Sequence, residues 1–309
     1  MRFWVGITDG GWFEHLRHRN LDEVNFWQPS AAPLTSVLGP GIPFLFKLRA
    51  PRNFIVGGGF FVRFTALPVR TVWETFGEGN GAASYAEFSA RLLALGGSAG
   101  RSDRMIACNV LIQPFFFEEP DWITVPDDWH PNVQRGKTYD SEQRPGAKLW
   151  LDVRERLART TASSELLISD EARGTRTYLA QARVGQGAFR CLVTDAYDRK
   201  CGVSGERTLP VLDAAHIKPY RRKGPNLTAN GLLLRKDIHK LFDDGYMTID
   251  ERFRVVVSRR IREEFENGRD YYQYEGRPLR ATVALDDQPS EEFLSWHREH
   301  VYEKWGATE

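Results

Sequence analysis

The chain has 309 residues, of which 41% are hydrophobic and 27% charged, a composition typical of globular proteins with room for two ordinary domains. No stretch approaches the roughly 20 apolar residues of a membrane span, and Met1–Gly6 lacks the regions of a signal peptide, so we expect a cytoplasmic protein without a membrane segment. The net charge of +1 does not by itself indicate nucleic-acid binding, and three cysteines without a C-x-x-C pair cannot form a disulfide framework and argue against a zinc ribbon.

The first half of the chain contains short apolar and aromatic runs separated by Gly and Pro. Four of these runs have the length and composition of strands: Arg2–Ile7, Pro43–Leu48, Phe54–Phe64 and Ile106–Phe117. The triplet Gly57–Gly59 inside the third run is typical of a bent strand. Val69–Phe76 and Tyr85–Leu95 have helical spacing. We therefore predict an α+β domain around a small β-barrel over residues 1–145.

A polar stretch with Pro and Gly, Pro131–Gly146, indicates the exit from this domain. Leu149–Ala158 and Thr175–Val184 are predicted helices of a connector over residues 146–184. The second domain then occupies residues 185–309. Near its end, Ser290–His297 is typical of a capped amphipathic helix, on which we expect His297 and His300 to lie at the surface.

The second domain contains the most informative stretch, in which three predicted elements follow one another. Pro210–Ala215 has strand character and places His216 at a strand end, and Leu232–Leu234 can form the returning strand. Lys236–Asp243 has the length of a short helix, on which His239 and Asp243 are four residues apart and share one face. An imidazole and a carboxylate placed in this way can hold a divalent cation, Mg²⁺ or Mn²⁺, and leave positions open for phosphate and water.

His216 is the candidate general base of this site. A neutral imidazole near its ordinary pKa can accept a proton from water at neutral pH. It does so better when an acceptor holds its second ring nitrogen, and we predict Asn230 as that partner. The nearby basic residues can contact the DNA backbone, although such runs also occur as solvated surface; they are Lys218, Arg221, Arg222 and Lys223.

His216, Asn230 and His239 resemble the three letters of the HNH nuclease motif. The resemblance extends over roughly Val184–Ser258. It implies the ββα-metal fold, with His216 as base, Asn230 as its orienting or structural partner, and His239 with Asp243 at the metal. In one respect the sequence departs from the family: many members carry an Asp or His ligand directly before the base, where this chain has Ala215. Either fewer side chains hold the cation, or Asp213 reaches it.

A nuclease domain that attacks the backbone common to all DNA needs another element to choose its target. Most of the tryptophans lie in the first half of the chain: Trp4, Trp12, Trp27, Trp73, Trp122, Trp129 and Trp150. Aromatic side chains are what a pocket needs to stack a base taken out of the duplex, although they also suit a core.

Several segments of the first half resemble the start of an EVE-type domain of the PUA superfamily: Arg2–Asp9, Asn25–Ser30, Pro43–Leu48 and Ile55–Phe61. That superfamily includes readers that flip modified cytosine into an aromatic pocket. The resemblance therefore implies a base pocket, for which our candidates are Trp12, Phe26, Trp27 and Phe60.

Together these features predict a modification-dependent endonuclease of phage defence, which cleaves double-stranded DNA containing 5-methylcytosine or 5-hydroxymethylcytosine. A homodimer is plausible, because one HNH site cuts one strand. Two alternatives stay open. The first domain can select another mark, such as phosphorothioate, or none. The chain can also be an inactive DNA-binding module, which Ala215 favours and the intact His216, Asn230, His239 and Asp243 disfavour.

Overall fold

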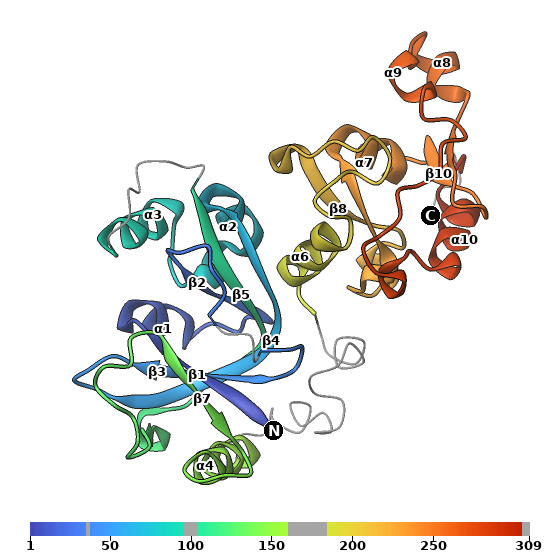
Figure 1. The fold of residues 1–309 in the computed structure, drawn as a ribbon. Helices are drawn as coiled ribbons and strands as arrows, with labels where there is room; N and C mark the ends of the chain where they lie inside the picture. The colour runs from blue at the N-terminus through green and yellow to red at the C-terminus, as the bar shows by residue number, and fades with distance from the viewer. Residues whose placement is uncertain (35–37, 96–103, 160–183, 305–309) are drawn as a thin grey trace. The chain divides into compact units, whose positions relative to one another are not determined.

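The computed structural model describes residues 1–34, 38–95, 104–159 and 184–304 (Figure 1). The chain forms two compact units, Met1–Ala188 and Phe189–Glu309, close to the predicted start of the second domain at residue 185. Within the described residues, no helix combines the length and the apolar composition needed to cross a membrane.

The first unit is built on one mixed sheet of seven strands. Its path runs β2 (Glu23–Gln28), β5 (Met105–Phe116), β4 (Phe54–Pro68), β3 (Pro43–Leu48), β1 (Arg2–Thr8) and β7 (Gly136–Asp140), and β6 (Ile123–Thr124) pairs with β4. Strands β1 and β3 are parallel, and every other pair is antiparallel. All four predicted strands are therefore present.

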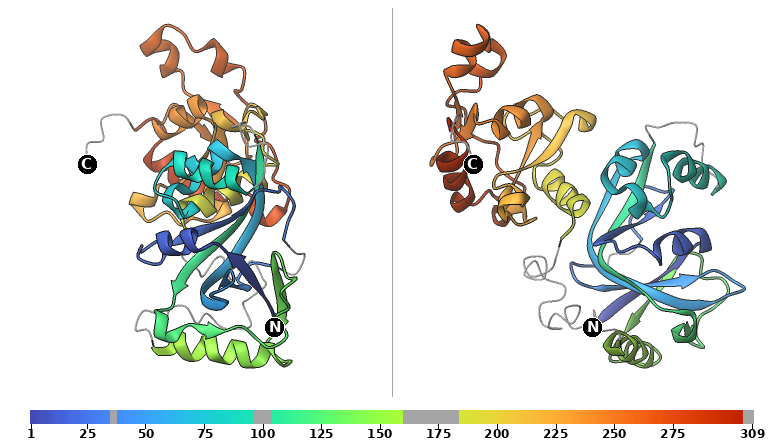
Figure 2. Two further views of the ribbon diagram at one scale, coloured as in Figure 1. Left: turned by 90° about the vertical axis from the view of Figure 1, so that its left-hand side faces the viewer. Right: turned by 180° about the vertical axis from the view of Figure 1, so that it is seen from behind.

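The sheet bends without closing into the predicted barrel. Among the described residues β2 pairs with β5 and β7 pairs with β1, so these two strands form the ends of the path. The curvature is concentrated in β4, where the register with β5 shifts between Gly58 and Phe60. A side chain at Gly57 would meet the carbonyl oxygen of Phe115 at 2.2 Å, which explains the need for glycine where β4 approaches its neighbour β5. Figure 2 shows the strongly bent β4 from two further sides.

Among the residues that the structure describes, four α-helices lie around this sheet: α1 (Gly10–Leu16), α2 (Val69–Phe76), α3 (Tyr85–Ala94) and α4 (Gly146–Arg159). Helices α2 and α3 lie at one end of the bent sheet and α4 at the other (Figures 1 and 2). Leu149, Trp150, Val153 and Leu157 of α4 are buried in a core cluster with Phe3 and Val5 of β1. Helix α4, predicted as part of the connector, thus packs as a component of the first unit. Of the other predicted connector helix only Val184 is described.

The second unit begins within α6 (Gln186–Ala196) and contains the predicted hairpin and helix. Strands β8 (Leu212–His216) and β9 (Gly231–Arg235) are antiparallel, with His216 opposite Gly231, and α7 (Lys236–Asp243) follows β9 directly. The remaining elements are the hairpin β10 (Met247–Ile249) and β11 (Val255–Val257), followed by α8 (Arg260–Phe265), α9 (Arg269–Tyr272) and α10 (Glu291–His300).

The hairpin and α7 close over one apolar core. Leu232, Leu233 and Leu234 of β9 are buried together with Ile238 and Phe242 of α7. On an eight-residue helix these two apolar positions are four residues apart, so they face the core together. His239 and Asp243 follow each of them by one residue and therefore lie on the neighbouring face of α7.

Candidate active site

His216 is the last residue of β8, and two contacts hold its ring. The ring stacks on Phe189 with centroids 4.0 Å apart and an interplanar angle of 15°. Its Nε2 lies 2.7 Å from Oδ1 of Asn226. Because an amide oxygen only accepts hydrogen bonds, Nε2 carries the proton, and the lone pair of the neutral ring is on Nδ1. Burial lowers the pKa of His216, although the hydrogen bond with Asn226 opposes this effect. The lowered pKa favours the neutral ring that a general base requires.

Asn226, and not Asn230, is therefore the hydrogen-bond partner of the His216 ring. Asn230 is fully buried directly before β9, at the end of a 3₁₀ turn over Thr228–Asn230, and its side chain binds the backbone of the loop between the two strands. Its Oδ1 accepts from the Lys218 amide at 2.8 Å, and its Nδ2 donates to the carbonyls of Lys218 at 3.0 Å and Pro225 at 2.9 Å. Asn230 thus has the structural role, holding the loop that carries Asn226.

His239 lies between two carboxylates. Its Nε2 is 3.2 Å from Oδ2 of Asp243, one turn further along α7. Its Nδ1 is 3.7 Å from Oδ2 of Asp213 on β8. Burial alone would lower the pKa of His239, but the two carboxylates outweigh it and raise the pKa. The His239 ring lowers the pKa of the Asp213 carboxyl in turn, although burial opposes it.

The donor types on α7 fit a divalent cation. Neighbouring ligands of an octahedral ion with bonds of about 2.1 Å are about 3 Å apart, close to the 3.2 Å between His239 and Asp243. Asp213 faces the opposite ring nitrogen, and Ala215, two residues later on the same face of β8, is fully buried. Accordingly, no group of three or more His, Cys, Asp or Glu side chains in the described ranges is arranged to hold a metal ion.

The predicted DNA-contact residues lie on the loop between β8 and β9. Arg221, Arg222 and Lys223 are exposed, within or directly after a 3₁₀ turn over Tyr220–Arg222. Lys218 differs, because it is half-buried and its Nζ lies 5.8 Å from the centre of the Trp296 ring on α10. Three of the four cations are therefore available to solvent beside the His216 loop.

His297, expected at the surface, is buried with 1% of its side chain exposed. Its ring stacks on Phe242 at 3.7 Å, its Nε2 donates to the Phe242 carbonyl at 3.0 Å, and its Nδ1 accepts from the Thr248 hydroxyl at 2.9 Å. Phe242 directly precedes Asp243, so His297 fixes the end of α7 that carries this carboxylate. The sequence signal was its spacing of three residues from Leu294, which is also buried and lies on the same face of α10.

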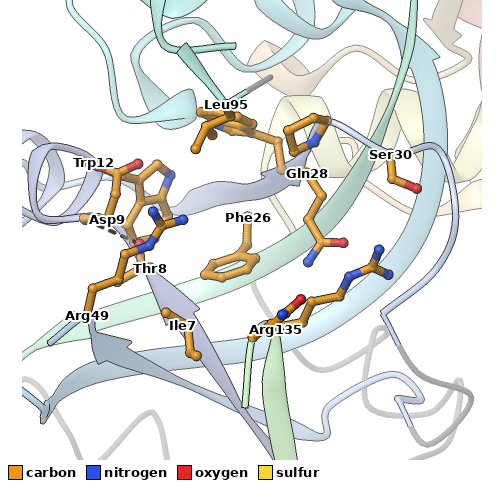
Figure 3. Close-up of a pocket in the computed structure, with 13 residues that line it drawn as sticks. Ile7, Thr8, Asp9, Trp12, Phe26, Gln28, Ser30, Arg49, Leu95 and Arg135 are labelled. Carbon is orange, nitrogen blue, oxygen red and sulfur yellow. Dashed lines mark hydrogen bonds between the residues drawn. The ribbon is translucent and has the colours of Figure 1, made fainter. Parts of the chain in front are cut away.

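A cavity of about 320 Å³ opens in the first unit, at the ends of β1 and β2 (Figure 3). Three of the four candidate base-pocket residues, Trp12, Phe26 and Trp27, line it. The two indole N–H groups donate to backbone carbonyls of Asn25 and Asn80, so the aromatic residues offer carbon surface to the cavity. Phe60 does not line it, because β4 directs this residue into the core, where its ring lies 6.3 Å from that of Phe115.

The polar groups of this cavity were not predicted. Asp9, Gln28, Ser30, Arg49 and Arg135 line it beside the aromatic residues. In Figure 3 Phe26 lies between Trp12 on one side and Gln28 on the other. The Oε1 of Gln28 is a buried acceptor without a hydrogen-bond partner in the described structure. Such an atom costs about 1–3 kcal/mol relative to a satisfied one, and a ligand with an N–H group would relieve that cost.

Residues 191–250 match the model of the HNH endonuclease family, so the second unit contains an HNH endonuclease domain. No curated protein matches the chain. Among solved structures, ASCH from Zymomonas mobilis is similar over 48% of this chain and 94% of its own length, with 8% identity and a TM-score of 0.33. The modification-dependent restriction endonuclease TagI is similar over 96% of this chain and 81% of its own, with 12% identity and a TM-score of 0.27. TM-scores this low establish no shared fold.

Proposed function

We propose that this chain is a metal-dependent DNA endonuclease whose first unit restricts cleavage to DNA with a modified cytosine, 5-methylcytosine or 5-hydroxymethylcytosine. The observation that carries the nuclease half is the oriented His216 ring, which interacts electrostatically with His239 and Asp243 within residues that match the HNH family. The cavity with three aromatic residues and a buried, unpaired acceptor supports the selective half.

In the proposed reaction His216 accepts a proton from water at Nδ1. The Asn226 amide oxygen holds the other ring nitrogen, so the lone pair keeps one direction. The water oxygen attacks phosphorus, the bond from phosphorus to the departing sugar oxygen breaks, and that oxygen takes up a proton from solvent. A cation held by His239 and Asp243 would offset the charge that builds on the phosphate oxygens.

Asp213 has a supporting role in this proposal. It lies at Nδ1 of His239, and Asp243 lies at Nε2. A carboxylate behind a ligating histidine fixes the ring orientation and raises the basicity of the ligating nitrogen. We therefore assign Asp213 to hold His239, with Nε2 and Asp243 directed at the cation, and this assignment accounts for an acidic residue two positions before Ala215.

The cavity of the first unit supports recognition of a cytosine taken out of the duplex. A flipped base can be sandwiched by aromatic carbon surface and read along its hydrogen-bonding edge. Cytosine carries an exocyclic amino group, which is the donor that Oε1 of Gln28 lacks. We assign the exposed Arg221, Arg222 and Lys223 to contacts with backbone phosphates of double-stranded DNA. Two copies of the chain would supply the two cuts of a double-strand break, as expected of a phage-defence enzyme.

The test is cleavage of three matched duplexes, unmodified, 5-methylcytosine and 5-hydroxymethylcytosine, by purified protein with Mg²⁺ or Mn²⁺. We expect cleavage of modified DNA and its loss in His216→Ala. Equal cleavage of all three duplexes would remove the modification dependence and leave the nuclease. No cleavage with either metal, together with retained binding, would identify an inactive DNA-binding module, the alternative that Ala215 favours.

A further inference from the structure

A second cavity of about 310 Å³ adjoins the proposed base pocket in the first unit. The two cavities share three lining residues, Ile7, Arg49 and Gln134, so they are neighbours. Lys47 lines only the second cavity, and on the parallel strands β1 and β3 it is the register partner of Ile7. The boundary between the cavities thus lies at the adjoining ends of these two strands.

Lys47 is a buried cation with little to neutralise it. Its side chain is 3% exposed, although an ammonium group is among the costliest groups to bury. Nζ donates to Oδ1 of Asn53 at 2.7 Å and lies 5.2 Å from the centre of the Trp129 ring. An ammonium has three N–H donors, and Asn53 accepts only one of them. In the described structure neither Lys47 nor Arg49 forms an ion pair with a carboxylate.

The rest of the second cavity is consistent with an anionic ligand. Its lining includes two cations, Lys47 and the exposed Arg49, and no acidic side chain. The other lining residues are neutral: Ile7, Ala50, Asn53, Val125, Trp129, Pro131, Val133 and Gln134. Burial lowers the pKa of Lys47, and no neighbouring charge counteracts this effect. An anion brought against Nζ would do so, and it would also accept the remaining donors.

We propose that the second cavity binds a phosphate group of the nucleotide whose base occupies the first, with Lys47 as its inner donor and Arg49 at its boundary with the base pocket. This inference rests on the proposed function, since it assumes a flipped nucleotide. A nucleotide consists of a base and a phosphate joined by a sugar, and the two adjoining cavities, one aromatic and one cationic, match those two parts. The phosphate contact would fix the register of the flipped nucleotide, and the aromatic cavity would read the base.

The experiment measures binding of the full chain to a duplex with one modified cytosine, in Ca²⁺ to suppress cleavage. In two further duplexes a neutral methylphosphonate replaces the phosphate on the 5′ or the 3′ side of that cytosine. One of the two replacements should weaken binding by about 10- to 100-fold, the range for a hydrogen bond between charged groups. In Lys47→Met that same replacement should weaken binding much less, because the inner donor is already removed and only Arg49 still contacts the phosphate.

Arg49→Gln provides a second variant on an exposed residue, in case Lys47→Met does not fold. It should reduce the methylphosphonate penalty in part. Lys148→Met is the matched control, because it removes an exposed lysine of α4 that lines neither cavity. The control should keep the full penalty.

The outcomes separate this inference from the proposed function. Binding that prefers modified DNA but ignores both methylphosphonates would overturn the phosphate subsite and leave the base pocket. Binding without preference for the modification would overturn the proposed selector. A further measurement uses tryptophan fluorescence to follow the binding of inorganic phosphate to the protein without DNA. If Lys47→Met abolishes the binding of inorganic phosphate but still shows the full methylphosphonate penalty, the cavity binds free phosphate and the nucleotide assignment fails.

Discussion

Asn226 and Asn230 permit a direct test of the roles derived above, because the same change at each should have opposite consequences. Asn230→Ala removes three hydrogen bonds of a fully buried side chain and leaves one amide and two carbonyls of the loop without that partner. At about 1 kcal/mol for each bond, the free energy of unfolding should fall by about 3 kcal/mol. Asn226→Ala removes the bond to the His216 ring from a half-buried position, so we expect a loss of about 1 kcal/mol.

Activity should change in the other order. General-base catalysis contributes about 10²- to 10⁴-fold, and a ring that loses its orientation loses part of this factor. Asn226→Ala should therefore lower the single-turnover cleavage rate about 10- to 100-fold, while Asn230→Ala should act mainly through the folded fraction. Urea unfolding measures the first quantity, and single-turnover cleavage at a temperature where each variant is folded measures the second. Wild-type cleavage by Asn226→Ala, or wild-type stability of Asn230→Ala, would refute these assignments.

Three further outcomes follow from the structure. Gln28→Met removes the unpaired acceptor of the base pocket without breaking a hydrogen bond of Oε1, so the fold should keep its stability while affinity for the duplex with a modified cytosine, measured by competition binding, falls about 10-fold; unchanged affinity would contradict the role of Gln28. Asp243→Asn should abolish cleavage and also the rise in melting temperature that Mn²⁺ causes. At an Mn²⁺ concentration of about 100 times the Kd, binding stabilises the folded protein by about 2.7 kcal/mol. An equal rise in the wild type and in Asp243→Asn would place the metal elsewhere. Burial lowers the pKa of His297 from 6.5 to about 4. Between these pH values the unfolded chain therefore binds a proton that the folded chain does not. The contribution of His297 to the free energy of unfolding should be complete above pH 6.5 and fall by about 3 kcal/mol as the pH drops to 4. His297→Gln should flatten this part of the urea-derived stability profile, and an unaltered slope would assign the titration to another group.

The local elements of the nuclease site could be predicted from the sequence. The strand before His216, the returning strand and the short helix each have their own pattern, and the four-residue spacing of His239 and Asp243 determines that they share a face of α7. In the first unit all four apolar runs form strands, and the helix of residues 69–76 has the predicted bounds. These features depend on neighbours in the chain, which a sequence displays directly.

Only the tertiary structure decided the partners of these residues. Asn226 and Asn230 are four positions apart in a loop, where no periodicity predicts a side-chain direction, and packing alone turns one to His216 and the other to the loop backbone. His297 is buried because α10 packs on the end of α7, which lies far away in the sequence. In the described residues the bent sheet stays open between β2 and β7, and it places Lys47 beside Ile7, next to the aromatic cavity. Each outcome depends on contacts between distant segments, and those contacts arise from the packing of the whole unit.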